Sequence, residues 1–223
     1  THKTYVFMML ATVLFIALAF TGTFGTWQAL VLLVALSYVL FDAFRDAHKH
    51  RKGAALAANE DEEEVEGADP NMPWWKIGLF LVLGLIGLPL GADLLVDNAV
   101  IIAREFGVSE TVIGLTLVAI GTSLPELATT VMSTLRKQSD VALGNVIGSN
   151  YFNLCGIIGV TALVAPVPVE ATFLTRDLWV MLGASLMLIP FVFLGKNITR
   201  VWGLLLLGLY VAYATATLIW RGA

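Results

Sequence analysis

Charged residues and cysteine are both scarce in this sequence. Only 13% of its 223 residues are charged and 58% are hydrophobic, whereas soluble domains carry about 25% charged residues. So little polar surface to face water excludes a soluble protein. A single cysteine excludes a disulfide-stapled scaffold, and the absence of a basic stripe argues against a nucleic-acid partner. The composition indicates a protein with several membrane spans, for which the lipid bilayer is the surrounding medium.

Long hydrophobic runs fill most of the chain. A helix needs about 20 mostly apolar residues to cross the roughly 30 Å of hydrocarbon in a bilayer. By this criterion we expect an all-α polytopic membrane protein with about seven transmembrane helices. The predicted spans are 5–22, 27–44, 75–97, 108–135, 141–164, 173–195 and 201–220. Because the first residue is Thr1 and not Met, we expect the chain to begin partway through a longer protein.

Basic residues are distributed unevenly between the two sides that these spans create. Three face one side, namely Arg104, Arg176 and Arg221. Ten face the other, namely Lys3, Arg45, Lys49, Arg51, Lys52, Lys76, Arg136, Lys137, Lys196 and Arg200. Because Lys and Arg accumulate in cytoplasmic loops, we expect the ten-residue side to be cytoplasmic and the C-terminus to lie outside the cell's inner or plasma membrane.

A long polar stretch divides the chain into parts. It is basic from Arg45 to Lys52 and acidic from Glu60 to Glu66. The acidic run could bind calcium, but the ligand spacing of a calcium-binding EF-hand loop is absent, so we favour a solvated, flexible tether. We therefore predict two transmembrane helices in 1–44, a cytoplasmic flexible loop in 45–73, and five helices in 74–223.

A carboxylate in the middle of an apolar span is the strongest functional signal. Residues 121–127 read GTSLPEL and place Glu126 within the predicted span 108–135, where a carboxylate is costly unless it meets a cation or a proton. Pro125 lacks an N–H and so frees a carbonyl one turn earlier, near Gly121. Thr122 lies one turn before Glu126, and Ser123 flanks that face. Carbonyls around Ala119, two hydroxyls and one carboxylate would then surround a point suited to Na⁺ or Ca²⁺. The alternative is a proline-kinked packing helix.

The next predicted span repeats the polar theme. Asn145, Ser149 and Asn153 recur at every fourth position and form one stripe along a helix, with Gly144 and Gly148 beside it. Small residues at this spacing permit close helix approach. Alone the stripe is equally well explained by ordinary packing, but after a short turn from Glu126 it suggests the other wall of the same cavity.

Two further carboxylates, Asp93 and Asp97, lie near the outer end of the span 75–97. They could line an outer vestibule or pair with Arg104, and we favour pairing or an interfacial position.

The motif pair resembles the second α-repeat of the sodium/calcium exchanger family, within the calcium:cation antiporters. GTSLPEL followed by GNVIGSN at 144–150 carries the resemblance, which is strong from about 91 to 158. The resemblance implies ten helices in two inverted halves, each giving one α-repeat to a central ion site. This chain would then be the C-terminal part, and a missing N-terminal half carrying the first α-repeat would be its partner.

The resemblance also implies roles for individual residues. Glu126 would be the principal ligand of Ca²⁺ and Na⁺, with oxygens from Thr122, Ala119, Ser123 and Ser149. Asn153 matches a position that is Asp in some members, so a charge role there is not expected. No cofactor is implied beyond the transported ions.

The sequence thus predicts a secondary antiporter that exchanges Na⁺ for Ca²⁺ by alternating access. A Ca²⁺/H⁺ or other cation antiporter is the alternative within the same class, and a non-transporting Ca²⁺-sensing or assembly module is the alternative outside it. An enzyme is not expected, because the sequence has no nucleophile–base pair and no phosphate-binding glycine loop.

Overall fold

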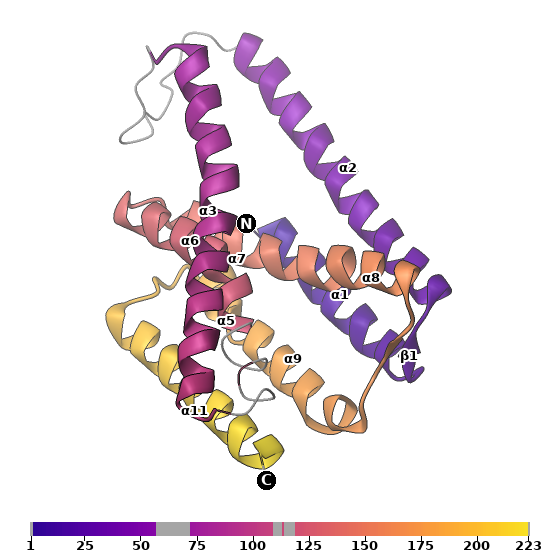
Figure 1. Ribbon diagram of the computed structural model, residues 1–223. Coiled ribbons are helices and arrows are strands. Elements are labelled where there is room, and N and C mark those ends of the chain that lie inside the picture. The colour runs from indigo at the N-terminus through magenta and orange to yellow at the C-terminus, as the bar shows by residue number, and fades with distance from the viewer. Residues whose placement is uncertain (1, 57–71, 109–112, 114–118, 223) are drawn as a thin grey trace. The chain divides into compact units, whose positions relative to one another are not determined.

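The computed structural model describes residues 2–56, 72–108, 113 and 119–222, and these residues are almost entirely helical. Figure 1 labels the elements along the chain. Their bounds are α1 (His2–Ala19), β1 (Thr23–Phe24), α2 (Thr26–Leu56), α3 (Trp74–Glu105), α5 (Ala119–Thr122), α6 (Leu124–Leu135), α7 (Ser139–Phe152), the π-helical turn η2 (Asn153–Ile157), α8 (Ile158–Val164), β2 (Val167–Pro168), the π-helical turn η3 (Phe173–Asp177), α9 (Leu178–Leu186), α10 (Ile189–Phe193) and α11 (Arg200–Gly222).

Six helical segments of the described chain are long and apolar enough to cross a bilayer, in agreement with six of the predicted spans. They are His2–Ala19, Thr26–Asp46, Trp74–Glu105, Ser139–Val164, Phe173–Phe193 and Arg200–Thr217. The remaining predicted span, 108–135, falls partly outside the described residues. Its described part consists of the short helices α5 and α6.

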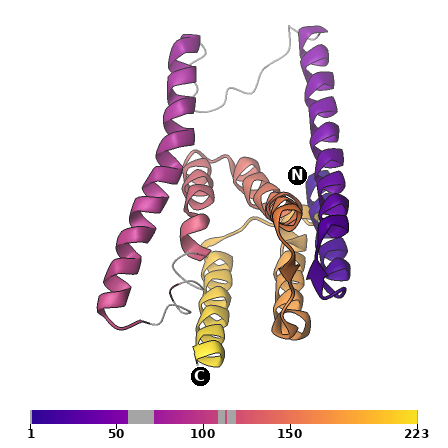
Figure 2. The same cartoon turned by 45° about the vertical axis from the view of Figure 1, so that its right-hand side comes forward.

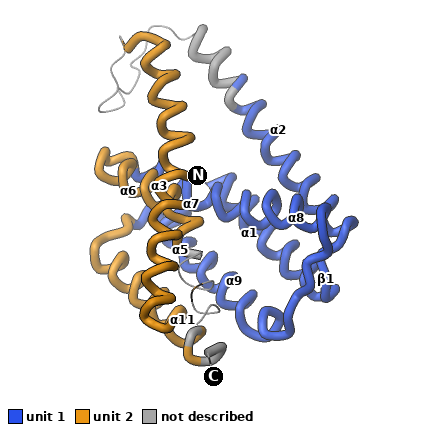
Figure 3. The backbone as a smooth tube through the Cα atoms, in the orientation of Figure 1, with its two compact units in different colours: residues 1–64, 139–196 blue, residues 65–138, 197–223 orange. Residues whose placement is uncertain are grey.

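The described chain forms two compact units, coloured separately in Figure 3. The first, unit 1, comprises 1–64 and 139–196. The second, unit 2, comprises 65–138 and 197–223.

Unit 1 is organised around a helical hairpin. α1 and α2 leave the turn at β1 in the same direction (Figures 1 and 2). Gly22 has a φ of +83° in this turn, a conformation that glycine adopts without steric cost. The side chain of Gln28 closes the turn, because its Oε1 accepts from the Gly25 N–H at 2.9 Å and its Nε2 donates to the Thr23 carbonyl at 2.7 Å. β1 also pairs antiparallel with β2, which joins the hairpin to the later part of the unit.

The core of unit 1 forms where α7, η2 and α8 pack on the hairpin. Its fully buried side chains include Tyr5, Leu32, Ile147 and Cys155. Two tyrosine hydroxyls tie helices together. Tyr5 donates to the Ser185 carbonyl and Tyr151 donates to the Ala35 carbonyl, each at 2.7 Å. Such bonds satisfy polar atoms that would otherwise be costly among apolar neighbours.

The close helix approach in unit 1 occurs at glycines other than the predicted pair. A Cβ added at Gly159 would lie 2.9 Å from Leu33 Cγ, and one at Gly156 would lie 3.3 Å from Leu36 Cδ2. At Gly144 and Gly148 an added Cβ meets no described atom within 4 Å. In this unit, therefore, α2 approaches the helix after Asn153 and not the GNVIGSN segment itself.

The open end of the hairpin carries an ion-pair cluster. The Lys3 ammonium contacts the carboxylates of Asp42 and Asp46, the latter at 2.9 Å. Asp42 is thus paired across the hairpin.

The helix α2 continues to Leu56, so the first part of the predicted 45–73 loop is helical. The reason is local, because this part is rich in Ala, Lys and Arg, which are strong helix formers. The acidic run 60–66 lies outside the described residues.

Unit 2 contains the long helix α3, the broken pair α5 and α6, and α11. Both α5 and α6 pack against α3. The side chains of this unit are mostly exposed, with Ala92 the buried residue of α3. This unit holds the predicted GTSLPEL motif.

Candidate functional site

The GTSLPEL segment breaks the helix at one residue. α5 ends at Thr122 and α6 begins at Leu124, so that Ser123 lies between them with φ −96° and ψ 1°. Pro125 occupies the first turn of α6, where its fixed φ and missing N–H are tolerated. Since Pro125 has no N–H, the Gly121 carbonyl cannot receive the helical hydrogen bond expected from that position. The break predicted from Pro125 is therefore present.

Glu126 lies in the first turn of α6, directly after this break. A helix N-terminus favours a negative charge because its N–H groups point toward it. One carboxylate oxygen, Oε2, is shielded from solvent. Below it, the Thr129 hydroxyl donates to the carbonyls of Pro125 and Glu126 at 3.1 and 2.9 Å. Both bonds lie within α6, in the turn that carries Glu126.

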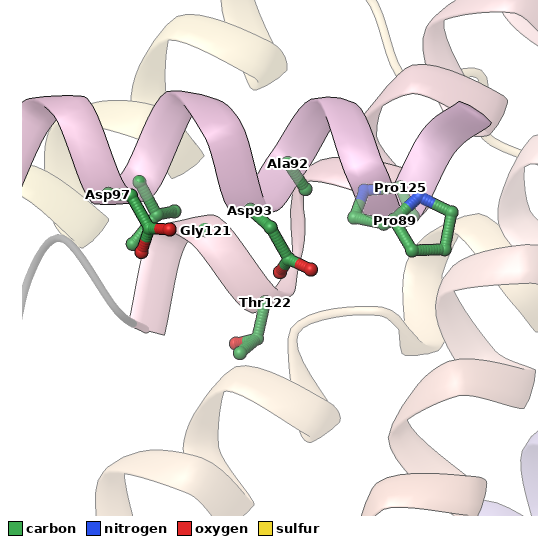
Figure 4. A pocket seen from close by; sticks show the side chains of 8 residues that line it. Pro89, Ala92, Asp93, Asp97, Gly121, Thr122 and Pro125 are labelled. Carbon is green, nitrogen blue, oxygen red and sulfur yellow. The ribbon is translucent and has the colours of Figure 1, made fainter. Parts of the chain in front are cut away.

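A cavity of about 260 Å³ opens beside the break. One wall comes from α5 and α6 and consists of Gly121, Thr122 and Pro125; the other comes from α3. The residues of the α3 wall are Pro89, Ala92, Asp93, Val96 and Asp97. Figure 4 shows the Asp93 carboxylate extending from α3 toward the end of α5, where Thr122 lies, and the Asp97 carboxylate beside Gly121.

Gly121 sets how closely α5 approaches α3. It is buried, and a Cβ added there would collide with the side chain of Val96. Any larger residue would push α5 away from α3 and displace Thr122 with it. Gly121 therefore has a packing role as well as its place in the helix break.

The predicted residues fall into two groups that belong to different units. Thr122, Ser123 and Glu126 cluster around the break in unit 2, with Ala119 as the first residue of α5. Residues 114–118, which precede α5, lie outside the described residues.

The second group lies in unit 1. Asn145 and Ser149 are half-buried on α7, one turn apart, and Asn153 is the first residue of the π-helical turn η2. The Ile158 N–H bonds to the Asn153 carbonyl at the end of this turn. π-helical turns inside helices are often found at functional sites. That the two groups form one cavity stays a prediction.

Asp93 and Asp97 both line the cavity beside Thr122. From the sequence, a vestibule is one of two alternatives for them, and pairing or an interfacial position is the favoured one. The signal was available, because a carboxylate within a membrane span is by default a functional candidate. What the sequence did not reveal is which helix face of 75–97 meets the broken helix.

Within the described residues, no group of three or more His, Cys, Asp and Glu side chains is placed to hold a metal ion.

These features define the class of the protein. Six apolar helices of membrane-spanning length, together with a short helix pair interrupted beside a proline and a carboxylate, are typical of integral membrane transporters, in which a broken helix presents ion ligands. The chain matches the sodium/calcium exchanger protein family over residues 76–219. It therefore belongs to the sodium/calcium exchanger family.

Individual relatives and solved structures agree with this assignment. The chain is 47% identical over 115 residues to the sodium/calcium exchanger MaX1 of Methanosarcina acetivorans, covering 52% of this chain and 33% of that protein. It is 34% identical over 180 residues to the inner membrane protein YrbG of Escherichia coli, covering 80% of this chain and 54% of that protein.

Among solved structures, the sodium-calcium exchanger NCX_Mj soaked with Na⁺ and Sr²⁺ matches with a TM-score of 0.68 and 33% identity, over 95% of this chain and 64% of that one. The chain thus has the exchanger fold, as the motif pair predicted, and matches about half or less of the length of these two curated relatives.

Proposed function

We propose that this chain is the ion-binding part of an antiporter that exchanges Na⁺ for Ca²⁺ by alternating access. The observation that carries the proposal is the position of Glu126. Its carboxylate lies in the first turn of α6, immediately after a proline break in an apolar segment. Such a charge is retained in a membrane protein when it serves a cation or a proton.

Glu126 would bind either ion in turn. Thr122 and Ser123 would add hydroxyl oxygens, and the backbone around Ala119 would add carbonyls freed by the break. Asn145, Ser149 and Asn153 would contribute oxygens from the second group. Because Na⁺ and Ca²⁺ would share these ligands, each must weaken the binding of the other by the same factor, and this competition is what couples the two fluxes.

The ligands proposed above include one carboxylate, that of Glu126. Ca²⁺ takes six to eight oxygens, usually with more than one carboxylate among them. The chain also matches only part of the length of the exchangers it resembles. We therefore infer that transport requires a first half carrying the other α-repeat, with the 45–73 segment on the cytoplasmic side and the C-terminus outside.

The decisive experiment is uptake of ⁴⁵Ca²⁺ into proteoliposomes loaded with Na⁺. The 223-residue chain is compared with a completed protein, in which a first half precedes it. Uptake by the completed protein that collapses when the Na⁺ gradient is removed supports the proposal. Uptake by the short chain alone would show that one repeat suffices and would overturn the proposed site.

A pH gradient distinguishes coupling to Na⁺ from coupling to H⁺. In the same vesicles, a pH gradient replaces the Na⁺ gradient at constant membrane potential. Uptake that follows the pH gradient and ignores Na⁺ would establish Ca²⁺/H⁺ exchange in place of Na⁺/Ca²⁺ exchange, with Glu126 as the proton carrier.

A further inference from the structure

The helix α3 carries two carboxylates that the proposed ion ligands do not include. Asp93 and Asp97 lie one turn apart on a helix long and apolar enough to span the membrane. Both line the cavity whose other wall is formed by Gly121, Thr122 and Pro125. Two charges on one face of a span are costly, so their presence calls for a function.

The packing of α5 on α3 fixes where these carboxylates lie. Val96, which stands between them in the sequence, contacts α5 at Gly121 so closely that no Cβ fits there. This contact sets the register of the two helices. As a result, Asp97 lies beside Gly121 and Asp93 extends toward the end of α5 (Figure 4).

Among the described residues that line the cavity, Asp93 and Asp97 are the charged ones. The other residues that line it are Pro89, Ala92, Val96, Gly121, Thr122 and Pro125, none of which is charged. Both carboxylates are exposed side chains and not buried ligands. A cleft with charge of one sign and low-dielectric walls concentrates counter-ions and accelerates their arrival by about 10- to 1,000-fold.

We propose that Asp93 and Asp97 are specificity-determining residues of this antiporter, which draw cations into the cavity at Thr122 and favour divalent over monovalent ions. The inference rests on the proposed function for the identity of the transported ions. The two carboxylates raise the local concentration of cations in the cavity beside Thr122 and leave the central ligand role to Glu126. Their effect is therefore on the apparent affinity for Ca²⁺ and not on the turnover of the loaded carrier.

The effect of the two carboxylates on charged molecules in the cavity can be measured without a transport assay. Cys155 is the single cysteine of the chain, so a Cys155→Ala background with Thr122→Cys places one reporter thiol in the cavity wall. The readout is the ratio of its reaction rates with a cationic and an anionic methanethiosulfonate reagent, in the 223-residue chain reconstituted in vesicles. A change in general accessibility alters both rates and cancels in the ratio.

The Asp93→Asn/Asp97→Asn variant should lower this ratio by about tenfold, and added salt should lower it in the parent more than in the variant. The Asp93→Glu/Asp97→Glu variant retains the charge and should retain the ratio. Glu105→Gln is the matched control, because Glu105 is an exposed carboxylate at the end of the same helix and does not line the cavity. A ratio within twofold of the parent in the double Asn variant would overturn the proposal.

In the completed antiporter, the double Asn variant should raise the Ca²⁺ concentration at half-maximal uptake several-fold, with little change in maximal rate. An unchanged half-maximal concentration would also overturn the proposal. If the parent shows no Na⁺-driven uptake, the proposed function fails. The ratio of the two thiol reaction rates still decides whether Asp93 and Asp97 attract cations into the cavity.

Discussion

The two compact units hold together in different ways. Unit 1 has a continuous core, in which residues of α1 and α2 are buried against Ile147 and Cys155. In unit 2, by contrast, α3 buries Ala92 and α6 buries no residue. Among the described residues, unit 1 therefore has a larger buried core of its own than unit 2.

This difference bears on function. The proline break, Glu126 and the cavity all belong to the sparsely packed unit. Regions with few buried apolar contacts are those from which moving elements are drawn. We therefore expect substitutions in unit 2 to act chiefly on ion binding and exchange, and substitutions in the core of unit 1 to act chiefly on stability.

The largest effect is expected for Glu126→Gln. The amide preserves the shape of the side chain but removes the charge, and loss of one partner from a shielded ion pair costs about 3–5 kcal/mol, or at least about 100-fold in cation affinity. Na⁺-driven ⁴⁵Ca²⁺ uptake by the completed protein should be abolished. Glu105→Gln removes an equal charge from the same unit and should leave uptake intact. Full exchange in the Glu126→Gln variant would exclude Glu126 as the central ligand.

The next effect is expected at the contact between α5 and α3. Gly121→Ala introduces a Cβ that collides with Val96, and overpacking of this kind costs about 1–3 kcal/mol. Uptake should fall, because Thr122 is displaced together with α5. Val96→Ala in the same protein removes the colliding methyl groups and should restore much of the loss, as a double-mutant cycle can measure.

Gly84→Ala is the control for this contact, since an added Cβ at Gly84 on α3 meets nothing within 4 Å. If Gly121→Ala and Gly84→Ala behave alike, the close approach of α5 to α3 does not position the site.

Two glycines of unit 1 provide a matched comparison of packing. Gly159→Ala places a Cβ 2.9 Å from Leu33 Cγ, whereas Gly148→Ala meets no described atom within 4 Å. The first should lower the free energy of unfolding by about 1–3 kcal/mol, and the second should change it little. Thermal unfolding in detergent measures both. The reverse order would mean that close helix contact is made at GNVIGSN after all.

A smaller effect is expected for Tyr151→Phe. The substitution removes the hydroxyl that donates to the Ala35 carbonyl at 2.7 Å, and a single hydrogen bond contributes about 0.5–1.5 kcal/mol. Tyr210→Phe on the exposed side of α11 is the control and should leave the unfolding temperature unchanged. An equal shift in both variants would show that the bond to Ala35 adds no stability.

Much of the fold was predictable because it depends on local sequence. Bilayer thickness imposes a minimum length on apolar runs, and six spans follow from it. The break before α6 follows from one missing N–H at Pro125. The continuation of α2 to Leu56 also depends on local sequence, since Ala, Lys and Arg favour a helix. The loop prediction for this segment rested on its high charge, which does not exclude a helix.

The sequence by itself determined the membrane class, the family, the broken helix and the candidate ligand Glu126, because hydropathy and proline geometry act within one or two helical turns. Tertiary structure alone decided that Asp93 and Asp97 share a cavity with Thr122. It also decided that, among the described residues of unit 1, α2 comes close to Gly156 and Gly159. These outcomes depend on which face of one helix meets another. That choice is made by the fit of side chains from distant parts of the chain, such as Val96 against Gly121, and no local pattern encodes it.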